Sequence, residues 1–476
     1  MISGLYLITD DNRDGHILNK VKKALTGGAR IVQYRAKDIH PDERRDIAAQ
    51  LCSLCHEHKA MLVINDFPEL ARDVGADGVH LGQDDMPIAQ ARQIVGRNKL
   101  IGISTHNVDE ALKAEAQGAD YIAFGSVFPT SSKENTTLVG LKNLSMVRKA
   151  VLIPLVAIGG MTPERASAAI NTGANSVAVI SGVMADDNPG RAAREFALLF
   201  NRQLSLPKGK VLTIAGSDSG GGAGIQADIK TITLLGSYAS SVLTSLTAQN
   251  TLGVSNIYNV HTDFVLQQLE AVLNDIGTDT VKTGMLNWGG IVWRIAKVIE
   301  ERHLLAVVDP VMVAKGGAAL LDQEAQDSLI SRLLPQAYLL TPNLPEVAAM
   351  TGITPETTAQ MIEAGRTLQS LGVRNVLLKG GHLQGEATDV LLIGEQEHQF
   401  TSPRINTPNT HGTGCSLAAA IATFLAQGYP LKEAVERSKR FVSIAIEHAI
   451  PIGQGHGPIN HFHAAMQLLH EKGPMD

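Results

Sequence analysis

Residues 30–66 read RIVQYRAKDIHPDERRDIAAQLCSLCHEHKAMLVIND and contain a complete strand–helix–strand unit. An apolar, β-branched run occupies Arg30–Arg35, a segment with helical spacing follows at Pro41–Lys59, and a second apolar run occupies Met61–Asn65. Two strands joined through a helix favour parallel pairing, because a parallel connection needs a long crossover. The unit therefore predicts an α/β fold with a parallel sheet.

The same alternation continues on both sides of this unit. Eight strands within about 200 residues predict a compact (β/α)8 TIM barrel. The alternative is an open doubly wound sheet, which normally carries a Gly-rich phosphate turn after its first strand. Leu7–Asp11 reads LITDD and is not such a turn. The predicted strands are Gly4–Thr9, Arg30–Arg35, Met61–Asn65, Asp77–Gly82, Lys99–Ser104, Asp120–Gly125, Ile153–Ile158 and Asn175–Ile180.

The pattern restarts after a polar segment, Asn201–Lys210 (NRQLSLPKGK), which has the composition of a linker. We predict a first domain over residues 1–203, a linker over 204–210 and a second domain over 211–476. The second domain fits one α/β sheet flanked by helices. Its predicted strands begin at Val211 (VLTIAG) and continue at Thr280–Thr283, Ala306–Asp309, Tyr338–Thr341 and Asn375–Lys379.

The composition of the chain indicates which classes of binding partner and which cellular compartment to expect. The 476 residues are 44% hydrophobic and 18% charged, which favours a folded core over disorder. A net charge of -6 gives no sign of the basic patch that binds nucleic acid or anionic membranes. The three cysteines, Cys52, Cys55 and Cys415, are too few for a disulfide scaffold, and Asp10–Asp11 interrupts any secretory signal. We therefore expect a cytoplasmic protein without a membrane span.

Polar residues of the first half gather where its predicted strands end, which is where barrel active sites lie. Arg35 and Lys37 are two residues apart in an extended segment, so they point the same way and suit a phosphate. Asp66 and Asp85 follow adjacent strands, and two carboxylates with room for water suit Mg²⁺. Glycines after the last two strands would offer N–H groups to a second phosphate.

Simpler alternatives remain for these features. Arg35 and Asp66 can form an ordinary ion pair, and Gly159–Gly160 can be a plain tight turn. Cys52–His56 (CSLCH) fits a haem-attachment or redox motif, but it lies inside the predicted helix. We therefore predict that its two cysteines are buried structural residues.

Seven motifs in order, QYRAK, IND, HLGQDD, GIS, FPTSSK, AIGG and VIS, span nearly all of the first half. Together they resemble thiamine-phosphate synthase. The resemblance implies Mg²⁺ at Asp66 and Asp85, with Arg35 and Lys133 stabilising charge on a departing diphosphate. It implies a hydroxymethylpyrimidine diphosphate site at Gln33, Tyr34, Arg35, Ala36, Lys37, Asn65, Ser104 and Lys133, and a thiazole phosphate site at Thr130, Ser131, Ser132, Gly160, Ile180 and Ser181.

Two glycine-containing segments of the second half suggest phosphate binding. Gly216–Gly224 follows a strand and opens a helix, so its backbone can approach a ligand, although it is neither a Walker A loop nor a Rossmann turn. Gly412–Cys415 (GTGC) precedes a long apolar helix and would form an anion hole at its positive end. A helix start lowers a thiol pKa, so Cys415 is predicted to be activated there.

Further strand ends supply metal candidates. Asp309 and Glu346 would hold Mg²⁺ directly or through water. Glu346 has an alternative role as a helix-capping residue, favoured by the helix dipole. Lys379–His382 (KGGH) ends another strand and is a nucleotide candidate.

The segments AGSDSGGGAGIQAD, TAQNT, KTGM, DPVM, TPNLPE, LLKGGH and HGTGC run from about Lys210 to the C-terminus. They resemble the hydroxymethylpyrimidine/phosphomethylpyrimidine kinases of the ribokinase-like group, which implies ATP as co-substrate. Cys415 would be the base toward the substrate hydroxyl, where related sugar kinases carry Asp. Ser219–Gly220 departs from the more familiar Pro-Ser pair. The implied pyrimidine pocket is Gly216, Asp228, Gln249 and Met285, and the implied anion hole is Gly412, Thr413, Gly414 and Cys415.

Together the two resemblances imply a thiamine-biosynthesis enzyme. The second half would phosphorylate hydroxymethylpyrimidine and its monophosphate with ATP, and the first half would couple the resulting diphosphate to thiazole phosphate. We expect small-molecule partners, no nucleic acid and a homo-oligomer. The rivals are a pyridoxal kinase fused to another phosphate-binding barrel, and a sensor in which one half is catalytically dead.

Overall fold

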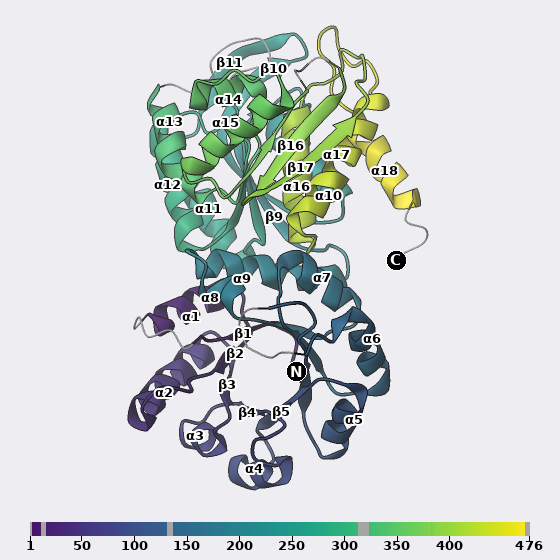
Figure 1. Cartoon of the computed structure of the whole chain (residues 1–476). Helices are drawn as coiled ribbons and strands as arrows, with labels where there is room; N and C mark the ends of the chain where they lie inside the picture. The colour runs from purple at the N-terminus through teal and green to yellow at the C-terminus, as the bar shows by residue number, and fades with distance from the viewer. Residues whose placement is uncertain are drawn as a thin grey trace. The chain divides into compact units, whose positions relative to one another are not determined.

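The computed structural model of the chain describes residues 2–10, 16–130, 137–312, 323–381, 383 and 385–471. The chain divides into two compact units, Met1–Phe200 and Asn201–Asp476 (Figure 1). Residues just after this division are held by the second unit: the Asn201 side chain donates to the Ala426 carbonyl, and the Lys208 N–H donates to the Gly236 carbonyl. The segment predicted as a linker therefore packs against the second unit.

The first unit is a closed barrel of eight parallel strands, arranged in chain order. Every predicted strand is present, with its ends within two residues of the prediction. The (β/α)8 interpretation is confirmed, and the open-sheet alternative is excluded by the pairing of the first strand with the eighth. The strands are β1 (Gly4–Ile8), β2 (Ile31–Tyr34), β3 (Met61–Asn65), β4 (Gly78–Leu81), β5 (Leu100–Thr105), β6 (Tyr121–Phe124), β7 (Leu155–Ile158) and β8 (Ser176–Val179).

Successive side chains of a strand point to opposite faces, so each strand serves two cores. Tyr6, Val63 and Tyr121 belong to a cluster inside the barrel, whereas Leu5 and Leu7 belong to a larger cluster beneath the helices. The helices surround the strands in Figure 1. They are α1 (Ile17–Thr26), α2 (Pro41–Glu57), α3 (Pro68–Asp73), α4 (Ile88–Val95), α5 (Val108–Ala116), α6 (Gly140–Ala150), α7 (Pro163–Asn171), α8 (Ser181–Met184) and α9 (Pro189–Leu198).

Cys52 and Cys55 lie unpaired on the buried face of α2. Burial raises the pKa of the Cys55 thiol to about 12, so this thiol is inert at neutral pH. The prediction that the two cysteines of the CSLCH segment are buried helix residues is confirmed.

The second unit is built on a nine-stranded sheet. Strands β10, β9, β12, β13, β14 and β15 are parallel in that spatial order, and antiparallel strands extend both edges. All five predicted strands are present, but β10, β11, β16 and β17 were not predicted. The strands are β9 (Lys210–Asp218), β10 (Tyr238–Asn250), β11 (Gly253–Asn259), β12 (Thr280–Thr283), β13 (Leu305–Val308), β14 (Leu339–Leu340), β15 (Asn375–Leu378), β16 (Ala387–Ile393) and β17 (Gln396–Ser402).

Helices cover both faces of this sheet in two groups (Figure 1). One group is α10 (Gly224–Leu234), α16 (Thr413–Ala426), α17 (Leu431–Glu447) and α18 (His461–Glu471), and the other is α11 (Thr262–Ala271), α12 (Gly289–Glu301), α13 (Gln323–Ser328), α14 (Leu344–Thr351) and α15 (Thr358–Ser370). Short 3-10 or π turns occupy Leu199–Gln203, Val272–Ile276, Leu329–Leu333 and Leu334–Gln336. Among the described helices, none is both long and apolar enough to cross a bilayer.

Candidate active sites

The barrel brings the predicted cations and carboxylates together at the carboxyl ends of β2, β3 and β4. Lys37 Nζ lies 3.8 Å from Asp66 Oδ2. Burial and a hydrogen bond to the Asp85 carboxyl raise the pKa of Asp66, whereas the charges of Lys37 and Arg35 oppose this rise. The ion pair formed with Asp66 therefore involves Lys37, whereas the ordinary ion pair considered above was between Arg35 and Asp66; the cluster also contains Asp85.

Two facing carboxylates of this kind fit a Mg²⁺ ion. Their mutual repulsion and burial favour a bound cation, and Mg²⁺ commonly takes one or two carboxylates together with waters and substrate phosphates. The backbone fixes both groups: Asp66 adopts a φ of 65°, and the Gly82 N–H donates to Asp85 Oδ2 at 2.6 Å. Over the described ranges no group of three or more His, Cys, Asp or Glu side chains could hold a metal ion.

Gln33, Asn65 and Ser104 face the barrel interior, because they continue the inward rows that contain Ile31, Val63 and Leu100. The alternation sends their neighbours outward. Tyr34 and Ala36 are buried in the core beneath the helices. Their side chains therefore point away from the barrel interior, which leaves their backbone for any contact with a ligand there.

The predicted thiazole phosphate residues are only partly described. Gly160 has a φ of 62°, and a Cβ at this position would overlap the carbonyl oxygen of Pro129, so the loops after β6 and β7 are in direct contact. Ile180 and Ser181 stand where β8 leads into α8, and Thr130 ends the described part of the loop after β6. The predicted Ser131, Ser132 and Lys133 lie outside the described residues.

In the second unit, the carboxylate of Asp218 organises the Gly-rich turn after β9. Its Oδ1 accepts the N–H of Gly220 at 2.8 Å, and its Oδ2 accepts those of Gly222 (3.1 Å) and Ala223 (2.8 Å). His411 Nε2 lies 2.9 Å from the same Oδ2. Burial would raise the pKa of Asp218, but these hydrogen bonds outweigh it and lower the pKa. The turn therefore closes around its own anion, which takes N–H groups that were predicted to face a ligand.

The predicted anion hole stands at the N-terminus of α16. Gly412 caps this helix with a φ of 79°, and a Cβ on it would overlap the carbonyl oxygen of Gly222. The loop before α16 therefore packs directly on the Gly-rich turn. The backbone N–H of Gly224 is near enough to lower the pKa of the Cys415 thiol, so the thiol lies beside the Gly-rich turn as well as in the predicted anion hole.

The prediction that a helix start lowers the pKa of the Cys415 thiol is wrong. Burial raises this pKa from 9.0 to about 11, with Asp228 and Asp309 adding to the rise. Lys282 and the Gly224 N–H oppose it without cancelling it. Removing a thiolate from water therefore outweighs the favourable end of the helix.

The predicted pyrimidine residues divide into two places. Gly216 faces Met285, because a Cβ on Gly216 would lie 2.6 Å from the Met285 methyl group. Gln249 ends β10 beside the anion-hole loop, with its Nε2 3.3 Å from His411 Nε2. Gly216 begins the Gly-rich segment, and Met285 and Gln249 lie next to that segment.

Asp228 is instead fully buried on α10. Its Oδ2 accepts from Lys282 Nζ at 2.8 Å and from Thr213 Oγ1 at 2.6 Å. Its Oδ1 has no hydrogen-bond partner within the part of the chain that the structure describes. Asp228 is therefore tied into the core near Cys415, with one oxygen left for a ligand or a water.

Asp309 and Glu346 lie close enough to influence each other's charge, with Lys379 beside both. Lys379 Nζ is 2.9 Å from Asp309 Oδ1. Glu346 Oε2 accepts the N–H of Asn343 at 2.8 Å in a capping box at the start of α14. The geometry thus supports the helix-capping alternative for Glu346 and leaves Asp309 as the stronger metal candidate.

Four residues of these sites were not assigned from the sequence: His80, Asp218, Lys282 and His411. Each is a polar residue inside a quoted motif, respectively HLGQDD, AGSDSGGGAG, KTGM and HGTGC. A hydrogen bond to a polar partner identifies all four, and His80, Asp218 and Lys282 are also buried. The motifs alone could have suggested these residues as candidates, but they do not show which residue each one hydrogen-bonds to.

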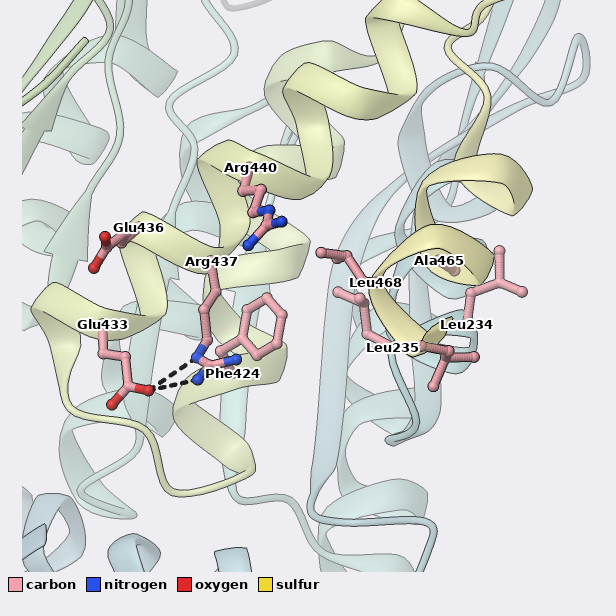
Figure 2. Close-up of a pocket in the computed structure, with 10 residues that line it drawn as sticks. Leu234, Leu235, Phe424, Glu433, Glu436, Arg437, Arg440, Ala465 and Leu468 are labelled. Carbon is pink, nitrogen blue, oxygen red and sulfur yellow. Dashed lines mark hydrogen bonds and ion pairs between the residues drawn. The ribbon is translucent and has the colours of Figure 1, made fainter. Parts of the chain in front are cut away.

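A separate surface pocket of about 290 Å³ lies between α10, α16, α17 and α18 (Figure 2). Leu234, Phe424 and Leu468 contribute apolar walls, and Arg437 is hydrogen-bonded to Glu433 at 2.8 Å. Phe424 is nine residues after Cys415, so the pocket lies about 13 Å along α16 from the anion hole. No predicted site residue lines it.

Comparison with known proteins identifies both units. A family model described as thiamine monophosphate synthase matches residues 5–183, and one described as phosphomethylpyrimidine kinase matches residues 218–460. The thiamine biosynthesis bifunctional protein of Geobacter sulfurreducens is 52% identical over 467 residues, which cover 98% of this chain and 95% of that protein.

Similarity to single-function kinases is confined to the second unit. The hydroxymethylpyrimidine/phosphomethylpyrimidine kinase of Haemophilus influenzae is 46% identical over 53% of this chain and 96% of its own. The solved pyridoxal kinase of Bacillus subtilis, in an ADP complex, superimposes with a TM-score of 0.52 at 39% identity, covering 56% of this chain and all of that one. The chain therefore belongs to the family of bifunctional thiamine-biosynthesis proteins, in which a thiamine-phosphate synthase precedes a hydroxymethylpyrimidine/phosphomethylpyrimidine kinase.

Proposed function

We propose that this chain carries out two consecutive steps of thiamine biosynthesis. The second unit phosphorylates 4-amino-5-hydroxymethyl-2-methylpyrimidine and then its monophosphate with ATP. The first unit couples the resulting diphosphate to thiazole phosphate. The observation that carries the proposal is near-full-length similarity to a bifunctional relative, combined with a cation–carboxylate cluster at the barrel end and an anion hole beside Cys415.

In the barrel, the bond between the pyrimidine methylene carbon and the diphosphate oxygen breaks, and the thiazole nitrogen forms a new bond to that carbon. Diphosphate leaves with the bonding electron pair. Arg35 and Lys133 would stabilise charge on the departing anion, and Gln33, Lys37 and Asn65 would bind the rest of the pyrimidine diphosphate. Asp66 and Asp85 would hold Mg²⁺, which supplies positive charge to the leaving group.

In the kinase, the substrate hydroxyl attacks the terminal phosphorus of ATP, and ADP leaves with the electron pair of the broken P–O bond; in the second step a phosphate oxygen of the monophosphate is the attacking group. We assign Cys415 as the base that takes the hydroxyl proton, and the N–H groups of residues 412–415 as the donors to the phosphoryl oxygens. Asp309, with Lys379 beside it, is the carboxylate best placed for Mg²⁺. Gln249 would bind the pyrimidine edge, because a carboxamide offers a donor and an acceptor side by side.

Incubation of the purified chain with hydroxymethylpyrimidine, thiazole phosphate, ATP and Mg²⁺ tests the whole proposal. Thiamine phosphate and diphosphate are the expected products. Omitting ATP should abolish them, and supplying pyrimidine diphosphate directly should restore them. Failure of both reactions would contradict the proposal.

Pyridoxal is the alternative substrate that a specific observation favours, since the second unit superimposes on a pyridoxal kinase. We expect a higher kcat/KM for hydroxymethylpyrimidine than for pyridoxal. A reversed order would identify the second unit as a pyridoxal kinase.

We also propose that the chain forms a homo-oligomer through β11. All residues of this edge strand are exposed, including Val254, Ile257 and Tyr258, and an exposed apolar edge strand is a template for pairing with another chain. Light scattering of the purified chain measures the oligomeric state. Three unpaired cysteines support a cytoplasmic location.

A further inference from the structure

Four hydrogen-bonded side chains form a line across the inside of the barrel. The Tyr6 hydroxyl of β1 lies 2.8 Å from the Tyr121 hydroxyl of β6. The Tyr121 hydroxyl lies 3.2 Å from His80 Nδ1 of β4, and His80 Nε2 lies 3.0 Å from Ser104 Oγ of β5. Tyr6, Tyr121 and His80 are buried, whereas Ser104 stands half-buried near the carboxyl end of its strand.

Packing holds this line in place. The Tyr121 ring occupies the space beside Gly102, where a Cβ would overlap the ring. The ring centroid of Tyr121 lies 6.1 Å from that of Tyr6 and 5.6 Å from that of His80. The other members of this hydrophobic cluster are aliphatic, and within the described residues the two tyrosine hydroxyls hydrogen-bond only to each other and to His80.

Tyr6, at one end of this line, determines which atom donates in each hydrogen bond. Tyr121 is the one hydrogen-bond partner of the Tyr6 hydroxyl among the residues that the structure describes. If Tyr6 only accepted, its own proton would be buried without an acceptor, which is unfavourable. Tyr6 therefore donates to Tyr121, and Tyr121, with a single proton, donates to His80 Nδ1.

Because His80 Nδ1 accepts this hydrogen bond, that nitrogen carries no proton and the imidazole is neutral. A neutral imidazole carries one N–H, and its other nitrogen accepts. Because Nδ1 accepts from Tyr121, the proton lies on Nε2 and is donated to Ser104 Oγ. Within the described ranges, Ser104 Oγ makes no other hydrogen bond. The Ser104 proton is therefore available to a ligand.

We propose that Tyr6, Tyr121 and His80 are positioning residues that set Ser104 as a hydrogen-bond donor to an acceptor atom of the pyrimidine diphosphate. The inference rests on the proposed synthase function, in which Ser104 belongs to that substrate's site. A serine that accepts a hydrogen bond from His80 cannot also donate one to it, so its own O–H is left to donate to a ligand atom with a lone pair at this position.

The test uses four variants of the full chain: His80→Leu, His80→Gln, Ser104→Ala and the double variant His80→Leu/Ser104→Ala. Synthase kinetics are measured with pyrimidine diphosphate and thiazole phosphate supplied directly, and kinase activity of the same chain normalises the enzyme concentration. We expect His80→Leu to raise KM for the pyrimidine diphosphate about tenfold, the effect of one lost hydrogen bond to a charged group. KM for thiazole phosphate should change little.

His80→Gln keeps a donor near the position of Nε2 and should recover most of the loss. If His80 acts through Ser104, the double variant should be no worse than Ser104→Ala alone. Multiplicative losses in the double variant would overturn the proposal, because His80 would then act independently of Ser104.

Tyr121→Phe keeps the ring and removes only the hydroxyl. It therefore tests the proposed direction of the hydrogen bonds without disturbing the packing of the ring. It should lower kcat/KM for the pyrimidine diphosphate several-fold, because His80 then has no donor fixing its tautomer. Unchanged kcat/KM would overturn the directional argument, even if His80→Leu did not fold. A wild-type chain that forms no thiamine phosphate from the two supplied substrates would instead refute the proposed function.

Discussion

At the scale of single residues, two opposing effects act on the pKa of the Cys415 thiol: the helix N-terminus lowers it and burial raises it. Their magnitudes decide the direction of the shift. A helix N-terminus typically stabilises an anion by about 0.3–1 kcal/mol, which corresponds to less than one pKa unit. Burial raises the pKa of this thiol from 9.0 to about 11, so desolvation wins. Only a small fraction of Cys415 is thiolate at neutral pH in the free enzyme.

This leads to a prediction about the kinase. Because the pKa of Cys415 lies near 11, kcat/KM should rise about tenfold per pH unit below that value, without a plateau near neutrality. Cys415→Ala should lower kinase turnover by about 10²–10⁴-fold, the usual worth of a general base, and remove this slope. Retained turnover in Cys415→Ala would exclude Cys415 as the base; synthase activity of the same chain is the control.

Asp66 leads to a second prediction at this scale. Its pKa is raised by burial and by Asp85, so protons compete with Mg²⁺ for the pair as the pH falls. The Mg²⁺ concentration for half-maximal synthase activity should increase between about pH 7 and pH 5. Asp66→Ala should abolish the synthase and spare the kinase, and normal synthase rates in this variant would refute the metal assignment.

At the scale of elements, the kinase site depends on close packing of two loops that are far apart in the sequence. His411, before α16, contacts Asp218 at the end of β9, and Gly222 lies beneath the His411 ring. A Cβ on Gly222 would lie 2.5 Å from His411 Cδ2. The turn therefore needs glycine at 222 for lack of space.

Gly222→Ala should displace His411, destabilise the second unit by about 1–3 kcal/mol as overpacking does, and reduce kinase activity. Gly290→Ala in α12 is the matched control. Its Cβ would meet nothing within 4 Å, and the change should be neutral or stabilise by up to about 1 kcal/mol. Urea unfolding and kinase assays of both variants check this, and equal behaviour would contradict the packing argument.

At the scale of the whole molecule, the two units divide at Phe200, and the residues that follow belong to the second unit. Arg202 stacks 4.5 Å from the Tyr429 ring centroid, and Asn201 bonds to Ala426. The segment that reads as a linker thus contributes contacts to the kinase fold. A polar sequence without helix or strand period can still be held in place by its neighbours.

Two truncations test this division. Fragment 201–476 should keep kinase activity, and fragment 210–476 should unfold several degrees lower, since roughly 2–4 °C is expected per kcal/mol lost. Fragment 1–200 should keep synthase activity. Thermal unfolding and activity assays provide the measurements, and equal melting temperatures of the two kinase fragments would contradict a structural role for residues 201–209.

The sequence by itself determined the alternation of strands and helices in the barrel, the five central strands of the second sheet and the family of each unit. These features follow from local apolar periodicity and from motifs of neighbouring residues. It did not reveal β10, β11, β16 and β17. In β11 every residue is exposed, so the strand lacks the alternation of buried and exposed positions that marks a half-buried strand.

Only the tertiary structure decided the raised pKa of Cys415, the capping role of Glu346 and the outward side chains of Tyr34 and Ala36. It also decided the pairing of His411 with Asp218, 193 residues apart in the chain. The physical reason is that burial and hydrogen-bond partners depend on which distant segments fold together, and local sequence patterns contain no information about that choice.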